Sequence, residues 1–200
     1  LRTLCLGFCP GEVSRFVVGG DTGQMLQGSR HAGPSASKPT PRIFEPEGAA
    51  PLGAGACMVH SLAFCPVPGL HAYMAAARSD GSLSLYQIDD PRPLRTWQGF
   101  TTAALLQVQW SPVRPCVLWT IDADATLHVF DLLDDESEPV VSTPLRKNAP
   151  RRPPPLGRSD GAAARLRLAV GTRPQARESE APSMLALTCS LAGDESSLDV

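Results

Sequence analysis

Several features that point to a membrane protein or a nucleic-acid partner are missing from this 200-residue sequence. The formal net charge is only −2, so no strong basic or acidic field argues for nucleic acid as a partner. No apolar run approaches the roughly 18 residues that a membrane-spanning helix needs, and no signal-peptide pattern is found. We therefore expect no membrane span and no nucleic-acid binding.

Motifs that carry catalysis are also missing. The glycine-rich stretch 19–23 lacks the Gly-Lys-Ser/Thr of a phosphate-binding loop, and it predicts a hairpin turn. Ser111, His128 and Asp131 are the residue types of a catalytic triad, but no Gly-x-Ser-x-Gly elbow accompanies them. We expect a protein that is not an enzyme, with no catalytic or cofactor-binding residue.

Possible metal ligands and paired carboxylates are few. Cys5 and Cys9 could begin a zinc site, but no second pair follows at ligand spacing, so no metal is expected. Asp122 and Asp124 could act as paired carboxylates, although a solvated turn is the simpler interpretation. The six cysteines lie in apolar, strand-like contexts, which favours reduced, buried side chains in a cytosolic protein.

A repeated pattern is the strongest positive signal. The 20 prolines and 17 glycines favour many short elements separated by turns. An alternating strand that ends in aromatic-x-Pro recurs with its aromatic residue at Phe8, Phe64 and Trp110, at separations of 56 and 46 residues. Each copy is followed by an apolar strand and a small or acidic turn, and a third alternating strand follows the turn clearly in the second and third copies. WD-type propeller blades repeat at roughly 40–45 residues.

The repeat predicts an all-β fold, a partial WD-repeat β-propeller of about four blades. An antiparallel sandwich or barrel is the alternative, but a threefold recurrence of one strand order favours the propeller. Predicted blades and insertions occupy these ranges: blades at about 1–28, 57–90, 101–133 and 165–200, and flexible insertions at 29–56 and 134–164. The fourth blade has the weakest pattern.

Two details qualify the pattern. The closing Trp-Asp of a regular WD blade is present only as Phe130-Asp131, so we expect an incomplete polar network and a larger share of apolar packing. The 134–164 insertion begins acidic, turns basic and includes Arg152–Pro155, which favours polyproline II. It could bind a proline-reading module or an acidic surface, or it could be a solvated insertion.

Function in such a scaffold would rest on its surfaces. Arginine and aromatic side chains in or beside loops are favoured at interface hot spots. The candidate partner-binding residues are Arg92, Arg95, Trp97, Phe100 and Arg114. For Trp97, packing between blades is favoured over contact with a partner.

The third unit also carries a family resemblance. Residues 106–133, above all Gln109–Pro115 and Val129–Leu133, resemble the penultimate blade of dynein intermediate chains. Stretches 16–23 and 78–86 resemble the same family. The match is best to the intermediate chains of cytoplasmic dynein 2, the motor for retrograde intraflagellar transport.

That resemblance implies a seven-bladed propeller that binds the dynein-2 heavy chain, beside a second intermediate chain. Light chains would bind an N-terminal region, and intraflagellar transport particles would be contacted indirectly. The implied location is the cytoplasm and cytoskeleton, including the cilium or flagellum and the ciliary base. The remaining blades would precede Leu1, so these blades alone would expose two faces and be marginally stable. The alternatives are a WD scaffold of another pathway, such as a ubiquitin-ligase adaptor or trafficking coat, and a small-ligand binder that uses the channel.

Overall fold

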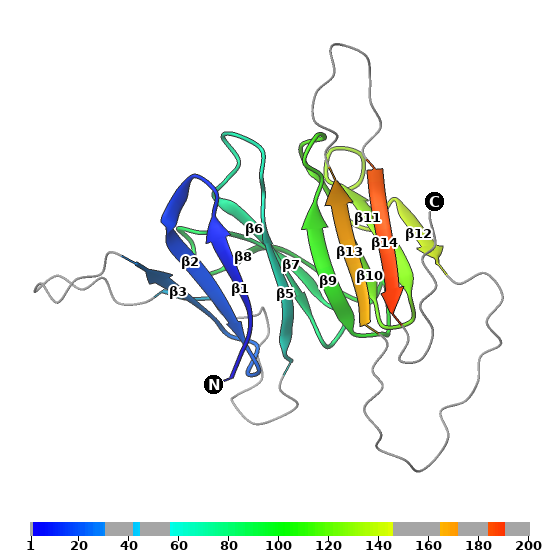
Figure 1. The fold of residues 1–200 in the computed structure, drawn as a ribbon, viewed down its shortest axis with the longest axis horizontal. Coiled ribbons are helices and arrows are strands. Elements are labelled where there is room, and N and C mark those ends of the chain that lie inside the picture. Colours follow the sequence, from blue (N-terminus) through cyan, green and yellow to red (C-terminus); the bar gives the residue numbers. More distant parts are fainter. Residues whose placement is uncertain (1, 31–41, 45–56, 146–164, 172–183, 191–200) are drawn as a thin grey trace, which may run out of the picture.

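The described part of the chain consists of strands joined by turns and loops. The computed structural model describes residues 2–30, 42–44, 57–145, 165–171 and 184–190. These residues include no helix, and so none that is long and apolar enough to cross a membrane. They form three four-stranded sheets and one two-stranded sheet (Figure 1). The predicted all-β class is confirmed.

Each four-stranded sheet is an antiparallel meander in which spatial order follows chain order. The first sheet contains β1 (Thr3–Cys9), β2 (Glu12–Gly20), β3 (Met25–Ser29) and β4 (Ile43–Phe44). The second contains β5 (Val59–Phe64), β6 (Tyr73–Arg78), β7 (Leu83–Gln87) and β8 (Pro93–Trp97). The third contains β9 (Leu105–Trp110), β10 (Val117–Asp122), β11 (Thr126–Asp131) and β12 (Val141–Pro144).

The first strands of the three sheets lie beside one another. β1 contacts β5, and β5 contacts β9 (Figure 1). The strand orders place β4, β8 and β12 at the opposite edges of their sheets. Sheets that share an inner row of strands and pack face to face are neighbouring blades of a β-propeller. The structure is therefore a partial propeller, as the repeat predicts.

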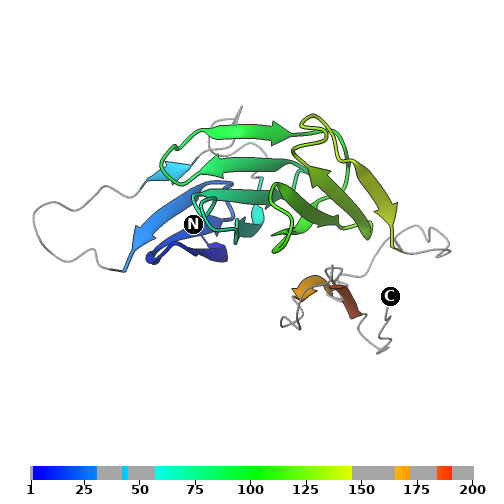
Figure 2. The ribbon, with the colours of Figure 1, turned by 90° about the horizontal axis from the view of Figure 1, so that it is seen from above.

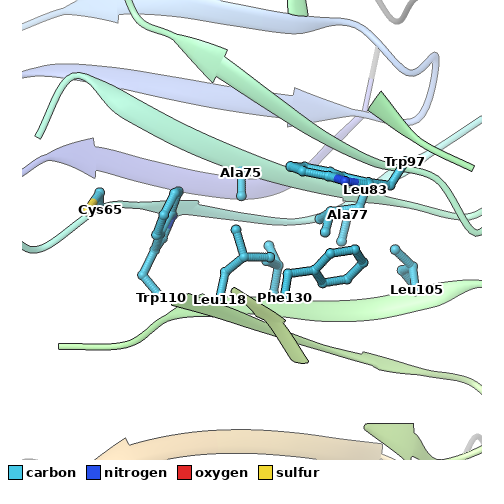
Figure 3. Close-up of a cluster of buried hydrophobic side chains, with 10 residues drawn as sticks. Cys65, Ala75, Ala77, Leu83, Trp97, Leu105, Trp110, Leu118 and Phe130 are labelled. Atoms are coloured by element: carbon cyan, nitrogen blue, oxygen red, sulfur yellow. The ribbon is translucent and has the colours of Figure 1, made fainter. Parts of the chain in front are cut away.

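Two apolar clusters hold the three sheets together. The cluster between the first and second sheets consists of buried residues from both: Val17, Met25, Phe44, Val59, Met74, Ala76 and Tyr86. The cluster between the second and third sheets is larger, and Figure 3 shows its side chains facing one another. It contains Cys65, Ala75, Ala77, Leu83, Trp97, Leu105, Val108, Trp110, Leu118 and Phe130. Small alanines on β6 let the aromatic rings on both sides approach closely.

Hairpin turns follow the expected chemistry with one exception. Gly23 and Gly81 have φ values of +80° and +82°, which glycine adopts without steric cost, so both predicted turns are confirmed. The matching turn of the third sheet places Ala125 at φ +61°. An alanine in this left-handed region is strained, so the third hairpin carries a cost that the second avoids.

A two-stranded hairpin follows the third sheet. β13 (Arg165–Gly171) pairs with β14 (Met184–Ser190), and these match the two strands predicted for the fourth unit. β13 lies next to β9 of the third sheet, and in Figure 2 the hairpin lies to one side of the three sheets. The predicted turn at 193–195 and strand at 196–200 lie outside the described residues.

The outer strands extend the sheets beyond the ranges that the repeat pattern gives. β4 and β12 lie within the predicted insertions 29–56 and 134–164, and β8 lies beyond residue 90. Most residues of these strands are exposed or half-buried, and β12 is exposed throughout. A strand that buries little apolar surface shows no clear alternation, which is why the pattern misses it. Residues 31–41, 45–56 and 146–164 of these insertions, including Arg152–Pro155, lie outside the described residues.

Candidate partner-binding surfaces

A groove of about 460 Å³ crosses the inner strands β1, β5 and β9. Prolines that follow these strands, Pro10, Pro66 and Pro112, form part of its lining. The lining includes no acidic, basic, histidine or cysteine side chain. The groove therefore offers apolar surface and hydrogen-bonding groups, and it lacks the residue types of an acid–base pair.

Hydrogen bonds between β5 and β9 join residues that line this groove. The Trp110 indole Nε1 donates to the Ala63 carbonyl oxygen at 3.0 Å, and the Val108 amide donates to Ser61 Oγ at 3.2 Å. These bonds satisfy polar groups at the sheet interface and fix the spacing of the two strands. Both bonds join the second sheet to the third.

A buried polar network occupies the third sheet beside this interface. The Asp122 side chain accepts hydrogen bonds from Thr101 Oγ1 at 2.8 Å and from two backbone amides of the following turn. Its Oδ2 lies 3.1 Å from His128 Nε2, and His128 Nδ1 lies 2.8 Å from Ser142 Oγ. Asp122 is only 2% exposed. A solvated turn at Asp122 is therefore a wrong interpretation, and the polar network is more complete here than expected.

The second sheet buries a cation at the corresponding interface. Arg78 is fully buried, and its guanidinium donates to Ser84 Oγ at 2.6 Å and to the Tyr86 hydroxyl at 2.7 Å. No carboxylate forms an ion pair with it among the described residues. Burial raises the pKa of Tyr86, although the neighbouring arginine opposes this, so the phenol stays neutral. This buried cation gives no signal in a single sequence.

The three triad-type residues do not form a triad. Ser111 Oγ accepts hydrogen bonds from the backbone amides of Val113 and Arg114, and Asp131 forms an ion pair with Arg114 at 2.8 Å. The His128 ring is engaged by Asp122 instead. These contacts stabilise loops and the sheet interface, and they leave no nucleophile beside a base.

The three candidate arginines lie at the surface. Arg92 and Arg95 are exposed, in the turn before β8 and on β8 itself. The Arg114 side chain is 70% exposed although it pairs with Asp131. All three can be reached by a partner, and their role in binding stays a prediction.

The two candidate aromatic residues lie inside the structure. Trp97 is 3% exposed, its ring centroid lies 5.2 Å from that of Phe130, and its indole nitrogen donates to the Glu136 carbonyl oxygen at 2.7 Å. Phe100 is half-buried and meets His128 and Phe130 edge-on. The Trp97 ring thus matches the packing alternative, because a partner could not reach it without opening the sheet interface.

The first sheet presents an apolar face that has no covering sheet among the described residues. Leu6 pairs with Val18, Val18 with Leu26, and Leu26 with Ile43, and cross-strand partners share one face of a sheet. On this face Leu6 is 51% exposed and Phe8 is 48% exposed. Phe8 occupies the register position of Phe64 and Trp110, which pack on the preceding sheets. The recurring aromatic position could have revealed this face from the sequence.

Five cysteines have described side chains, and these are free thiols: Cys5, Cys9, Cys57, Cys65 and Cys116. Only Cys9 and Cys65 are buried and the other three are half-buried, so the predicted burial is wrong for those three. Burial, followed by the neighbouring Asp80 carboxylate, raises the pKa of Cys57 to about 11. A thiol with a raised pKa is a poor nucleophile at neutral pH. No group of three His, Cys, Asp or Glu side chains that could hold a metal ion is found within the described ranges.

Comparison with known proteins finds dynein subunits. Cytoplasmic dynein 2 intermediate chain 1 of Mus musculus is 33% identical over 147 residues, which is 72% of this chain and 14% of the relative. The Homo sapiens protein of the same name is 30% identical over 148 residues, 74% of this chain and 13% of the relative. Cytoplasmic dynein 2 intermediate chain 2 of Mus musculus is 34% identical over 67 residues, 34% of this chain and 12% of the relative.

These matches cover a small part of each relative. The chain spans about one seventh of the length of the first two relatives. No protein-family model matches the chain. The matches to both intermediate chains of cytoplasmic dynein 2 agree with the family that residues 106–133 resemble.

Proposed function

The chain belongs to the dynein intermediate chain family, and from this we propose that it is a portion of an intermediate-chain subunit of a cytoplasmic dynein 2 motor. The observation that carries the proposal is an identity of 30–33% that extends over nearly three quarters of the chain. A match over nearly three quarters of the chain cannot be confined to one loop or motif. It therefore supports a shared role better than a shared fold alone would.

The architecture supports a non-catalytic role within this proposal. Neighbouring sheets are fixed by large apolar clusters and by hydrogen bonds such as that of Trp110. The groove on the inner strands has an uncharged lining. Packed sheets with an uncharged groove and exposed arginines suit protein contact, and the described residues provide no acid, base or nucleophile arranged for chemistry.

The finer part of the proposal concerns partners. The propeller binds the dynein-2 heavy chain and lies beside a second intermediate chain, while dynein light chains bind elsewhere in the full-length protein. The subunit thereby supports retrograde intraflagellar transport and cilium assembly. Its location is the cytoplasm and cytoskeleton, with the cilium and ciliary base as the working sites.

The exposed arginines are the residues from which contact with the heavy chain can be tested. Arg92 and Arg95 lie together at the outer edge of the second sheet, and Arg114 lies in the loop before β10. Arginine contributes charge, a planar hydrogen-bonding fork and apolar contact at interfaces. Replacement of Arg92 and Arg95 by alanine should weaken heavy-chain binding without unfolding the sheets.

Affinity purification of the full-length protein from ciliated cells tests the proposal. The dynein-2 heavy chain should be recovered with the wild-type protein, and in smaller amounts with the double variant Arg92→Ala and Arg95→Ala. Arg30→Ala serves as a matched control on another exposed arginine. Failure to recover the heavy chain with a folded wild-type protein would overturn the proposal. Recovery of a ubiquitin ligase or a trafficking coat instead would favour the alternative scaffold role.

A further inference from the structure

One further feature of the third sheet concerns β12, its outer edge strand. All four residues of β12 are exposed, and among the described strands it pairs with β11 alone. Thr143 lies in this strand and is followed directly by Pro144. A residue before proline is restricted to extended backbone, which is the conformation that Thr143 has here.

From this placement we infer that Thr143 is a phosphorylation site for a proline-directed Ser/Thr protein kinase. Such kinases accept a hydroxyl residue in an extended segment that is followed by proline, a residue without a backbone N–H. Thr143 is exposed, so a kinase can reach its hydroxyl. No hydrogen bond of this hydroxyl is found among the described residues.

A second hydroxyl residue followed by proline, Ser111, differs from Thr143 in its exposure to solvent. Ser111 precedes Pro112, and each of the two hydroxyl residues has an arginine three positions later in the sequence. Ser111, however, is 2% exposed, and its Oγ accepts backbone hydrogen bonds at 3.0 Å and 3.4 Å. The same motif is therefore accessible at Thr143 and hidden at Ser111.

The neighbouring Ser142 provides a second contrast within β12. Its hydroxyl lies 2.8 Å from His128 Nδ1 and belongs to the buried network of Asp122. Ser142 and Thr143 point to opposite faces of the strand, because successive side chains alternate. The inward hydroxyl is committed to the fold, while the outward one is available to an enzyme.

A kinase must lift β12 from β11 to hold it in its own active site. The strand pairs over four residues and buries no side chain, so local opening costs little compared with unfolding of the sheet. The bond between Ser142 and His128 is the one side-chain hydrogen bond that retains β12 among those found in the described residues. Loss of that hydroxyl should raise the rate of phosphorylation at Thr143.

The reaction is ordinary phosphoryl transfer with ATP as donor. Thr143 Oγ1 attacks the γ-phosphorus, the bond from that phosphorus to the bridging oxygen breaks, and ADP leaves. The hydroxyl proton passes to the catalytic carboxylate of the kinase. The product adds a charge of about −1.5 to −2 at the sheet edge. The segment that precedes β12 in the sequence is already acidic and exposed, with Asp134, Asp135, Glu136 and Glu138.

The test is phosphorylation of the purified full-length protein by a cyclin-dependent kinase and ATP, with each site located by mass spectrometry. Phosphate is expected on Thr143 and absent from Ser111. Thr143→Val should abolish that phosphate, and Ser142→Ala should retain it and acquire it faster than the wild type. Heat-unfolded protein should gain phosphate on Ser111.

Two results would overturn the assignment. One is a folded protein in which Thr143 stays unmodified, and the other is one in which Ser111 is modified to the same extent as Thr143. Thr40, which also precedes a proline, lies outside the described residues, and site-resolved detection separates it from Thr143. Binding to the heavy chain is not part of this readout, so failure here leaves the proposed function untouched.

Discussion

The first and third sheets place different chemistry at the same register positions. Where the third sheet has Trp110 and His128, the first has Phe8 and Leu26. Trp110 and His128 are buried against the second sheet, whereas Phe8 is 48% exposed. A face that is covered can hold a buried polar network, because the neighbouring sheet excludes water and strengthens each hydrogen bond.

Both interfaces of the second sheet share apolar packing, but their buried polar groups differ. Apolar clusters form on both sides of the second sheet, while the polar groups differ between a buried arginine and a buried carboxylate. Packing of alternating strands thus defines the fold, and each interface satisfies its own polar groups. The following variants test this distinction.

The largest expected effect comes from the recurring aromatic position. Trp110→Ala should lower the free energy of unfolding by about 3–5 kcal/mol, because it opens a cavity and removes the hydrogen bond to Ala63. Phe8→Ala should cost about 1 kcal/mol or less, since half of that ring is already exposed. Urea unfolding of the full-length protein measures both, and equal losses would show that the first sheet is covered in the same way.

The buried carboxylate of the third sheet should have the next largest effect. Asp122→Ala leaves His128, Thr101 and two backbone amides without their acceptor, so we expect a loss of about 3 kcal/mol. The matched control is Asp124→Ala in the same turn, where the side chain is exposed and the loss should stay below about 0.5 kcal/mol. Similar losses for the two variants would mean that the network contributes nothing.

The hairpin turns of the second and third sheets allow an exchange in both directions. Gly81→Ala should cost about 1–2 kcal/mol, because the backbone is left-handed there and an added Cβ would lie 3.0 Å from the carbonyl oxygens of Ala103 and Thr101. Ala125→Gly should stabilise the protein by about 0.5–1 kcal/mol, since it removes the same strain. Thermal unfolding of the pair measures both signs, and destabilisation by Ala125→Gly would refute the strain.

The smallest expected effect is a pH dependence at the edge of the second sheet. The pKa of Cys57 is raised from 9.0 to about 11 in the folded protein, so the unfolded chain releases this proton first. This contribution to stability is complete below pH 9 and is lost as the pH rises toward 11. The thiol is half-buried, so solvent reduces the effect. The difference in stability between wild type and Cys57→Ala should shrink over that range, and a constant difference would contradict the raised pKa.

The sequence reveals the inner strands of this fold better than its outer strands. The strands around Phe64 and Trp110 alternate and end in proline, so periodicity predicts them. β12 is exposed throughout, and β4 contains only two residues, so neither has a pattern to detect. Their positions follow from hydrogen bonding to β11 and β3, which a single sequence does not show.

The sequence also predicts the exposure of some candidate surface residues better than the contacts of buried polar residues. Loop position predicts exposure correctly for Arg92, Arg95 and Arg114, because a long charged side chain reaches solvent from almost any loop. Trp97 is different, because packing between blades is the favoured role of such a residue, and its ring does fill space between the second and third sheets. The roles of Arg78 and Asp122 also depend on pairing between strands, so they become visible only in the structure.

The measurement that tests the proposed role most directly is reconstitution of purified full-length protein with the purified tail of the dynein-2 heavy chain. Size-exclusion chromatography with light-scattering detection should show one complex that contains both chains, and Trp110→Ala, which weakens the packing of the sheets, should reduce its yield. Separate elution of the two chains, while circular dichroism shows that the wild-type protein is folded, would contradict a heavy-chain-binding propeller.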